Sequence, residues 1–180
     1  MKTFEFSIIA SGLDPEAEGF ADRFFEAGCD DATISFHKGH IILDFARNAA
    51  SIDVAIASAV DCVKNAGAHV DRVEPDPLVS LSDIAARTGL SRAAITQYAK
   101  GQRSEDFPAP VARVTSDTSL YDWSQVATWF YQQKKLSRDQ AIEATAVTIA
   151  NEAIRAGDTK LRETLQGRLE EYEASLPKAA

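Results

Sequence analysis

The chain is poor in the features that mark secreted, metal-binding and membrane-spanning proteins. Its 180 residues include only two cysteines, one methionine and two tryptophans, and no apolar run approaches the length of a membrane span. The opening stretch MKTFEFSIIASG contains Glu5 and is too short for a signal peptide, so we expect a cytoplasmic protein with no membrane partner. Cys29 and Cys62 lack the spacing of metal ligands. We predict that they are small buried thiols in a reducing compartment.

The common catalytic patterns are also missing. The sequence has no serine–histidine–aspartate order of a hydrolase triad, no Walker loop, no HExxH and no cysteine–histidine cluster. His37 and His40 flank a predicted two-residue turn. We interpret them as exposed histidines at a hairpin tip, the alternative being a surface metal or pH-sensing site. We therefore predict that the protein is not an enzyme and holds neither a cofactor nor a metal.

Acidic residues outnumber basic ones, and the excess is uneven along the chain. The formal net charge is −8, from 27 acidic and 19 basic residues. Residues 1–75 hold 6 basic and 13 acidic side chains (net −7), residues 76–136 hold 7 and 6 (net +1), and residues 137–180 hold 6 and 8 (net −2). Only the middle segment has a basic excess, and it amounts to one charge. Phosphate neutralisation supplies most nonspecific affinity for nucleic acid, so if this segment bound DNA, one copy would bind weakly and would need a dimer or a partner protein.

The segment Leu81–Lys100, LSDIAARTGLSRAAITQYAK, has the spacing of two short helices joined by a tight turn. Gly89 lies in the turn, where a positive φ costs glycine little, and Ser91 stands where the second helix needs an N-cap. The residues predicted to face inward are Ile84, Ala85, Thr88, Leu90, Ile95 and Tyr98. The side chains predicted on the opposite face can bond base edges and phosphates, and they are Arg92, Thr96, Gln97 and Lys100. The alternative is an αα-hairpin in which Ser91 is only a cap and Arg92 only a solvated charge.

The residues after this segment predict a small hairpin and a further helix. Gly101 ends the second helix, and Pro108 and Pro110 force an extended stretch. Strands at 111–115 and 119–121 are expected to pair around a turn at 116–118. Asp122 is then placed to cap a helix whose apolar stripe is Val126, Trp129 and Phe130.

Taken in order, the stretches DIAARTGLSRAAITQYAKG, FPAPV and LYDWSQVATWF resemble the winged helix-turn-helix of the MerR and excisionase (AlpA-like) regulators. The resemblance covers only the central third of the chain. It implies that the helix at 91–100 enters the major groove and that a wing follows the DNA backbone. The residues that it assigns to DNA binding are Ser91, Arg92, Thr96, Gln97 and Lys100 in the groove, with Arg103 and Arg113 at phosphates near the wing. The long dimerising coiled coil of full-length MerR proteins is not evident in this sequence.

Residues 1–75 have the pattern of a β-α-β-β-α-β unit, which predicts a ferredoxin-like plait. Strands are expected at 3–9, 32–37, 40–45 and 69–73, with one helix capped by Asp14 and another by Ser51. The side chains predicted to face the core of the sheet are Phe4, Phe6, Ile8, Ile34, Phe36, Ile41, Leu43 and Phe45. The stiff Pro75–Asp76–Pro77 segment is the predicted domain boundary.

Residues 137–180 are predicted to form a helical tail. One helix is capped by Ser137 and stopped by Gly157, and a second carries a leucine stripe at Leu161, Leu165 and Leu169. Such a stripe needs a covering partner, which is either the same chain or another protein. The sequence thus predicts an α+β fold with a ferredoxin-like domain at 1–75, a winged helix-turn-helix at 78–136 and a helical tail at 137–180.

From these patterns we predict a sequence-specific transcriptional regulator that binds double-stranded DNA as a homodimer. The alternative is an antitoxin-like or adaptor protein. In that case the acidic N-terminal domain or the tail would bind a partner protein, and the winged helix would only autoregulate.

Overall fold

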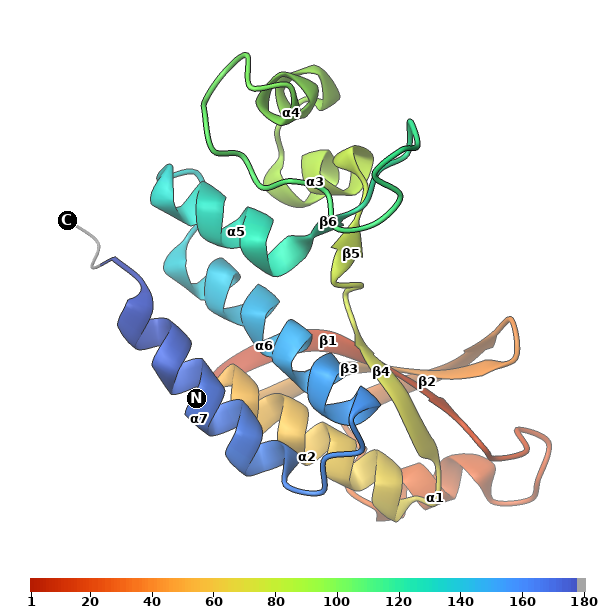
Figure 1. Ribbon diagram of the computed structural model, residues 1–180. Helices are drawn as coiled ribbons and strands as arrows, with labels where there is room; N and C mark the ends of the chain where they lie inside the picture. Colours follow the sequence, from red (N-terminus) through yellow and green to blue (C-terminus); the bar gives the residue numbers. More distant parts are fainter. Residues whose placement is uncertain (178–180) are drawn as a thin grey trace. The chain divides into compact units, whose positions relative to one another are not determined.

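A computed structural model describes residues 1–177 and divides into two compact units. Unit 1 contains residues 1–75 and 146–174, and unit 2 contains residues 76–145 and 175–177. Within the described residues the fold is mixed α/β, with seven helices, a four-stranded antiparallel sheet and a two-stranded sheet (Figure 1). No helix in this part of the chain is long and apolar enough to cross a membrane.

Unit 1 is built on the four-stranded sheet. Its strands are β1 (Lys2–Ser11), β2 (Ala32–His37), β3 (His40–Ala49) and β4 (His69–Glu74), in the spatial order β2-β3-β1-β4. All three neighbouring pairs are antiparallel. With α1 (Phe20–Glu26) and α2 (Ile52–Asn65), the elements of residues 1–75 follow the predicted β-α-β-β-α-β order.

The core of unit 1 lies on one face of this sheet, as the alternating pattern predicts. Phe6, Ile8 and Leu43 are buried, and α2 adds side chains such as Ile56 and Val60 that are fully buried. The predicted core residue Phe36 is 44% exposed, because β2 is an edge strand that the helices cover incompletely.

Two local predictions for unit 1 are wrong. The helix expected from Asp14 begins only at Phe20, because Asp14 Oδ1 accepts from the Glu16 N–H in a turn and Gly19 takes a left-handed φ of 73°. Cys29 and Cys62 form a disulfide, with their Cα atoms 5.9 Å apart, where we had expected two thiols. The cysteines therefore give no support to a reducing compartment.

The C-terminal helices α6 (Arg138–Arg155) and α7 (Leu161–Ser175) complete unit 1 from residue 146 onward. The leucine stripe of α7 is buried, with exposures of 6%, 0% and 3% for Leu161, Leu165 and Leu169. An ion pair joins α7 to α2, beside which it runs (Figure 1): Arg162 Nη2 lies 3.0 Å from Asp61 Oδ2. The stripe is thus covered by its own chain. Of the two alternatives that the sequence left open for the covering partner, the structure shows the same chain.

A side chain of α6 closes one edge of the sheet. The Val73 N–H on β4 donates to Asn151 Oδ1, and Asn151 Nδ2 donates to the Val73 carbonyl oxygen, both at 2.8 Å. Asn151 is 6% exposed. The amide therefore occupies the place of a neighbouring peptide group and satisfies an edge residue that would otherwise be left unpaired.

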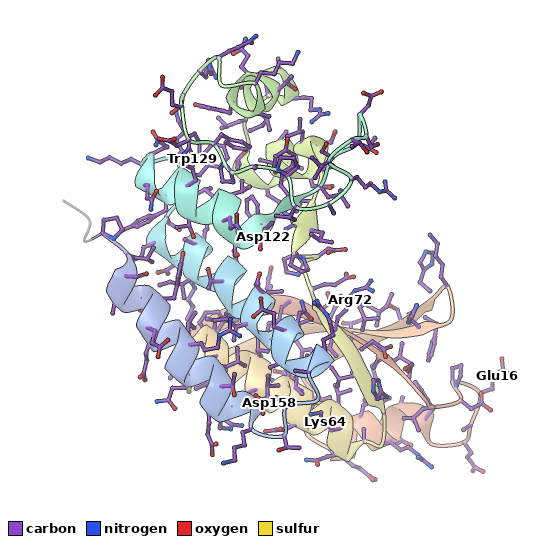
Figure 2. The ribbon with its side chains drawn as sticks, viewed as in Figure 1. Glu16, Lys64, Arg72, Asp122, Trp129 and Asp158 are labelled. Atoms are coloured by element: carbon purple, nitrogen blue, oxygen red, sulfur yellow. A yellow bond between two sulfur atoms is a disulfide. The ribbon has the colours of Figure 1, made fainter. Side chains whose placement is uncertain are left out.

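Unit 2 contains four elements from the centre of the chain, followed by α5 (Trp123–Gln132) and the start of α6. The helices α3 (Leu81–Thr88) and α4 (Arg92–Ala99) are preceded by β5 (Leu78–Val79), which pairs with β6 (Tyr121–Asp122). Asp122 caps α5 by accepting from the Ser124 and Gln125 amides, as predicted, and Trp129 lies further along the same helix (Figure 2). The buried core contains Ile84, Ile95, Tyr98, Val126, Trp129 and Phe130.

The prediction of a hairpin over residues 111–121 is also wrong for most of its length. Ala112 and Leu120 form a single isolated bridge, and Tyr121 pairs with Val79 of β5 instead of with its predicted hairpin partner. Beyond the bridge, Arg113 adopts a φ of 50°, which ends the extended backbone that a strand requires. Residues 111–120 therefore form a closed loop with one bridge at its base.

Candidate nucleic-acid interface

Each helix of the α3–α4 pair begins at a serine that caps its N-terminus. The Ser80 hydroxyl accepts from the Asp83 N–H, and the Asp83 carboxylate accepts from the Ser80 backbone, in a capping box. Hydrogen bonds from the Ser80 hydroxyl and amide hold the pKa of Asp83 below its usual value. Gly89 ends α3 with a φ of 69°, and α4 begins where Ser91 Oγ accepts from the Ala94 N–H at 3.1 Å.

One face of α4 is fixed against the core. Ile95 is fully buried and Tyr98 is 6% exposed. The Tyr98 ring meets Trp129 and Phe130 edge-on, with centroids 5.3 and 5.7 Å away. The helices α3 and α4 run in clearly different directions (Figure 1). This packing sets which side chains of α4 face away from unit 2's core.

The outward face of α4 carries cations and an amide. Arg92, Gln97 and Lys100 are exposed, and within residues 1–177 their side chains form no hydrogen bond or ion pair. Arg92 and Lys100 are two helical turns apart in one row, and Gln97 lies on the adjacent row. The structure thus brings these three predicted groove residues to one surface.

The other two predicted groove residues are already engaged within the helix. Thr96 is half-buried and its hydroxyl donates to the Arg92 carbonyl oxygen at 2.9 Å. The Ser91 hydroxyl is the N-cap acceptor. Each therefore retains only part of its hydrogen-bonding capacity for a ligand.

The two predicted phosphate contacts are placed differently from each other. Arg103 follows α4 directly, and its guanidinium lies over the Tyr98 ring, 5.7 Å from the centroid, while the residue stays exposed. Arg113 is exposed in the 111–120 loop, and in the described residues no hydrogen bond or ion pair joins its side chain to α4. Arg103 is therefore held near α4 through Tyr98, a residue of the core-facing side of that helix.

Comparison with protein-family models, with curated proteins and with solved structures finds no match for this chain. Within residues 1–177 no group of three or more histidine, cysteine, aspartate or glutamate side chains is arranged to hold a metal ion. The assignment of a function therefore depends on the side chains themselves.

Two residues that join distant segments of unit 2 were missed from the sequence. Arg87 donates to the Asp76 carbonyl oxygen at 3.0 Å, and its guanidinium lies 5.2 Å from the Trp123 ring. Phe107 fills the space beside Trp129, with ring centroids 5.1 Å apart. Both contacts join segments that are distant in sequence, so helical spacing gives no sign of the Arg87 contacts. The apolar Phe107 in front of two prolines was a usable signal.

The start of α4 also lies near β6. Burial raises the pKa of the Tyr121 hydroxyl, and the positive charge of Arg92 opposes that rise. Arg92 is therefore close enough for its charge to act on Tyr121, next to the residue at the base of the 111–120 loop.

Proposed function

We propose that unit 2 is a winged helix-turn-helix module that binds double-stranded DNA, and that the chain is a sequence-specific transcriptional regulator with a ferredoxin-like plait in unit 1. The observation that carries the proposal is the division of α4 into two faces. One face is locked into an aromatic core by Ile95 and Tyr98. The other presents Arg92, Gln97 and Lys100 to solvent.

The chemistry of this exposed face fits a major groove. Arginine can bond guanine O6 and N7 in a bidentate manner, glutamine can do the same with adenine N6 and N7, and lysine bonds phosphates or guanine. An eight-residue helix such as α4 is about 12 Å long, which is close to the width of the groove. We assign base readout to Arg92 and Gln97, and phosphate contacts to Lys100 and Arg103.

The test is selection of DNA from a random double-stranded pool, followed by binding of the variants Arg92→Ala and Gln97→Ala to the selected and scrambled sequences. Each variant should lose about 1–3 kcal/mol of binding free energy on the selected sequence and much less on the scrambled one. Lys135→Ala is the matched control, because it removes an exposed cation from the turn after α5. It should weaken binding to both sequences slightly and equally.

Two results would reject this assignment. If the pool yields no enriched sequence, unit 2 does not read DNA. If Arg92→Ala and Gln97→Ala lose the same affinity on both sequences, α4 contacts only the backbone. Far-UV circular dichroism of each variant should match that of the unmodified chain, because both side chains project away from the core.

The charge of unit 1 supports a second candidate, in which the chain is an antitoxin-like or adaptor protein that binds a basic partner. Residues 1–75 hold 13 acidic and 6 basic side chains. Glu5 and Asp44 are exposed on the face of the sheet opposite the core. Co-purification of a small basic protein, lost in the double variant Glu5→Gln, Asp44→Asn, would favour this candidate over DNA readout alone.

A further inference from the structure

We propose that β2 pairs with β2 of a second copy of the chain, antiparallel and centred on Ser35, so that the two sheets join into one. The inference concerns unit 1 alone and does not depend on DNA binding by unit 2. The leucine stripe of α7 is buried in its own chain, so it is not available for a dimer contact.

The two edges of the sheet differ in how they are protected. The β4 edge has a register shift in its pairing with β1 between Ile9 and Ala10, a charged pair of Arg72 and Glu74 at 2.8 Å, and the Asn151 amide on Val73. These are devices that keep an edge strand from pairing with another chain. The β2 edge has none of them: its sequence, ATISFH, contains no acidic residue, lysine, arginine, proline or glycine, and its pairing with β3 is regular. Within the described residues no strand covers it.

The hairpin turn shows which backbone groups of β2 face outward. Lys38 and Gly39 both have positive φ, 52° and 82°, in a two-residue turn flanked by the pair His37 and His40. In such a turn the flanking pair is hydrogen bonded, and bonded and non-bonded pairs then alternate along the ladder. The bond from the Ala46 N–H to the Asp31 carbonyl oxygen, at 3.1 Å, fits this alternation. The groups that point away from β3 therefore belong to Ala32, Ile34 and Phe36.

One register of self-pairing uses the available groups. The Ala32 N–H already donates to the Cys29 carbonyl oxygen at 3.1 Å, which leaves Ile34 and Phe36 with both groups available. An antiparallel pair centred on Ser35 sets Ile34 opposite Phe36 of the second copy, so each exchanges both bonds with the other. It also keeps the core-side residues of both strands on the same face. A register centred on Ile34 would need the Ala32 N–H and is therefore disfavoured.

The side chains at this edge favour a second copy as the occupant. Phe36 on β2 is 44% exposed, and Phe25 on α1 is 68% exposed. The helix α1 contacts β2 through Phe20 and Phe36, whose ring centroids are 5.1 Å apart. Cross-strand pairs of an aromatic and a β-branched residue stabilise a sheet. Because β2 itself carries no acidic or basic charge, two acidic units can meet there without placing like charges directly opposite each other.

The experiment is oxidative crosslinking of the full chain carrying Ser35→Cys, with Thr33→Cys as the matched control. In the proposed register the two Ser35 residues form a non-bonded pair with Cα atoms about 4.5 Å apart, within the range of a disulfide. Thr33 lies opposite His37 of the second copy, and the two Thr33 residues are separated by roughly 13 Å along the strands. Ser35→Cys should give a covalent dimer on a non-reducing gel, whereas Thr33→Cys and the unmodified chain should not.

A second variant tests the contact without new thiols. Ser35→Glu sets two carboxylates opposite each other in the dimer, and the site is exposed in the monomer. Light scattering should show a dimer for the full chain and a monomer for this variant, and far-UV circular dichroism should show that the variant keeps its fold. Raising the salt concentration should increase the dimer fraction, since residues 1–75 carry a net −7. A monomeric full chain, equal crosslinking at positions 33 and 35, or a dimer that survives Ser35→Glu would overturn the proposal.

Discussion

Replacing Asn151 with aspartate should destabilise unit 1 in a pH-dependent manner. The change alters one atom of an amide that accepts from the Val73 N–H and donates to the Val73 carbonyl, both at 2.8 Å. An ionised carboxylate still accepts from the N–H, but it has no hydrogen to donate and faces the carbonyl oxygen instead. A protonated carboxyl group can replace both bonds, because it has one donor and one acceptor.

The expected loss follows from the burial of the site. Asn151 is 6% exposed and the Val73 residue is fully buried, so the carbonyl oxygen finds no water to replace the lost donor. An unsatisfied buried group costs about 1–3 kcal/mol, and a buried charge adds to this cost. We therefore expect Asn151→Asp to lower the free energy of unfolding by about 2–4 kcal/mol at neutral pH. Burial and the facing carbonyl raise the carboxyl pKa in the folded state. Stability should accordingly recover as the pH falls through that raised pKa, because the folded state binds the proton more tightly than the unfolded one.

The assay must report on unit 1. Both tryptophans, Trp123 and Trp129, belong to unit 2, so their fluorescence would miss the effect. Hydrogen exchange of the Val73 amide, with urea unfolding followed by far-UV circular dichroism, measures it at neutral and mildly acidic pH. Asn48→Asp is the control, because Asn48 is exposed on the same sheet and accepts from Thr3, and it should change little. Equal stability of Asn151→Asp and the unmodified chain at neutral pH, or a loss that grows in acid, would refute the reasoning.

Two further predictions concern the same unit. The bidentate hydrogen bonds from Arg47 hold the pKa of Asp31 below its usual value of 3.8, so the carboxylate contributes stability that is complete above the unfolded-state pKa and is lost as the pH falls through the lower folded-state pKa. Asp31→Asn should therefore be less stable than the unmodified chain at neutral pH and converge on it in acid, in urea unfolding curves measured by circular dichroism. Leu165→Ala should cost about 2–5 kcal/mol, because Leu165 is fully buried in the contact of α7 with its own chain, whereas Gln166→Ala on the exposed side should be nearly neutral. An unchanged melting temperature for Leu165→Ala would mean that the stripe is not part of the core.

Sequence reasoning succeeded where the cause of the structure is local. Alternation placed Phe6 and Ile8 on the covered face of β1, and the hydroxyls of Ser91 and Ser137 accept from amides at the starts of α4 and α6. Helical spacing also separated the buried Ile95 from the exposed face of α4. These outcomes depend on residues within a few positions of each other, whose geometry the backbone fixes.

The features that were missed depend on contacts between distant segments. The disulfide joins Cys29 to Cys62 across 33 residues, and Asn151 reaches Val73 across 78. The hairpin prediction failed for the same reason. The strand β6 pairs with β5, and the two residues of β5 are too short a segment to be predicted as a strand from sequence. For the candidate site, the sequence predicts exposure well, but it does not show that Thr96 bonds its own helix. DNA binding remains a prediction.

The distribution of charge connects the two proposals. Residues 76–136 carry only one net positive charge, so under the proposed function a single copy of unit 2 would make few phosphate contacts with DNA. Two copies would double both the contacts and the bases read, provided that something other than α7 joins them, because its leucines are buried. The uncharged edge of β2 is a surface on unit 1 where two such acidic chains can meet without direct repulsion. Salt should therefore act in opposite directions on the two equilibria, since screening strengthens the β2 contact and competes with the phosphate contacts. The affinity for DNA measured at fixed protein concentration thus depends on salt through both the β2 contact and the phosphate contacts. The Ser35→Glu variant removes only the β2 contact, so its salt dependence reports on the phosphate contacts alone.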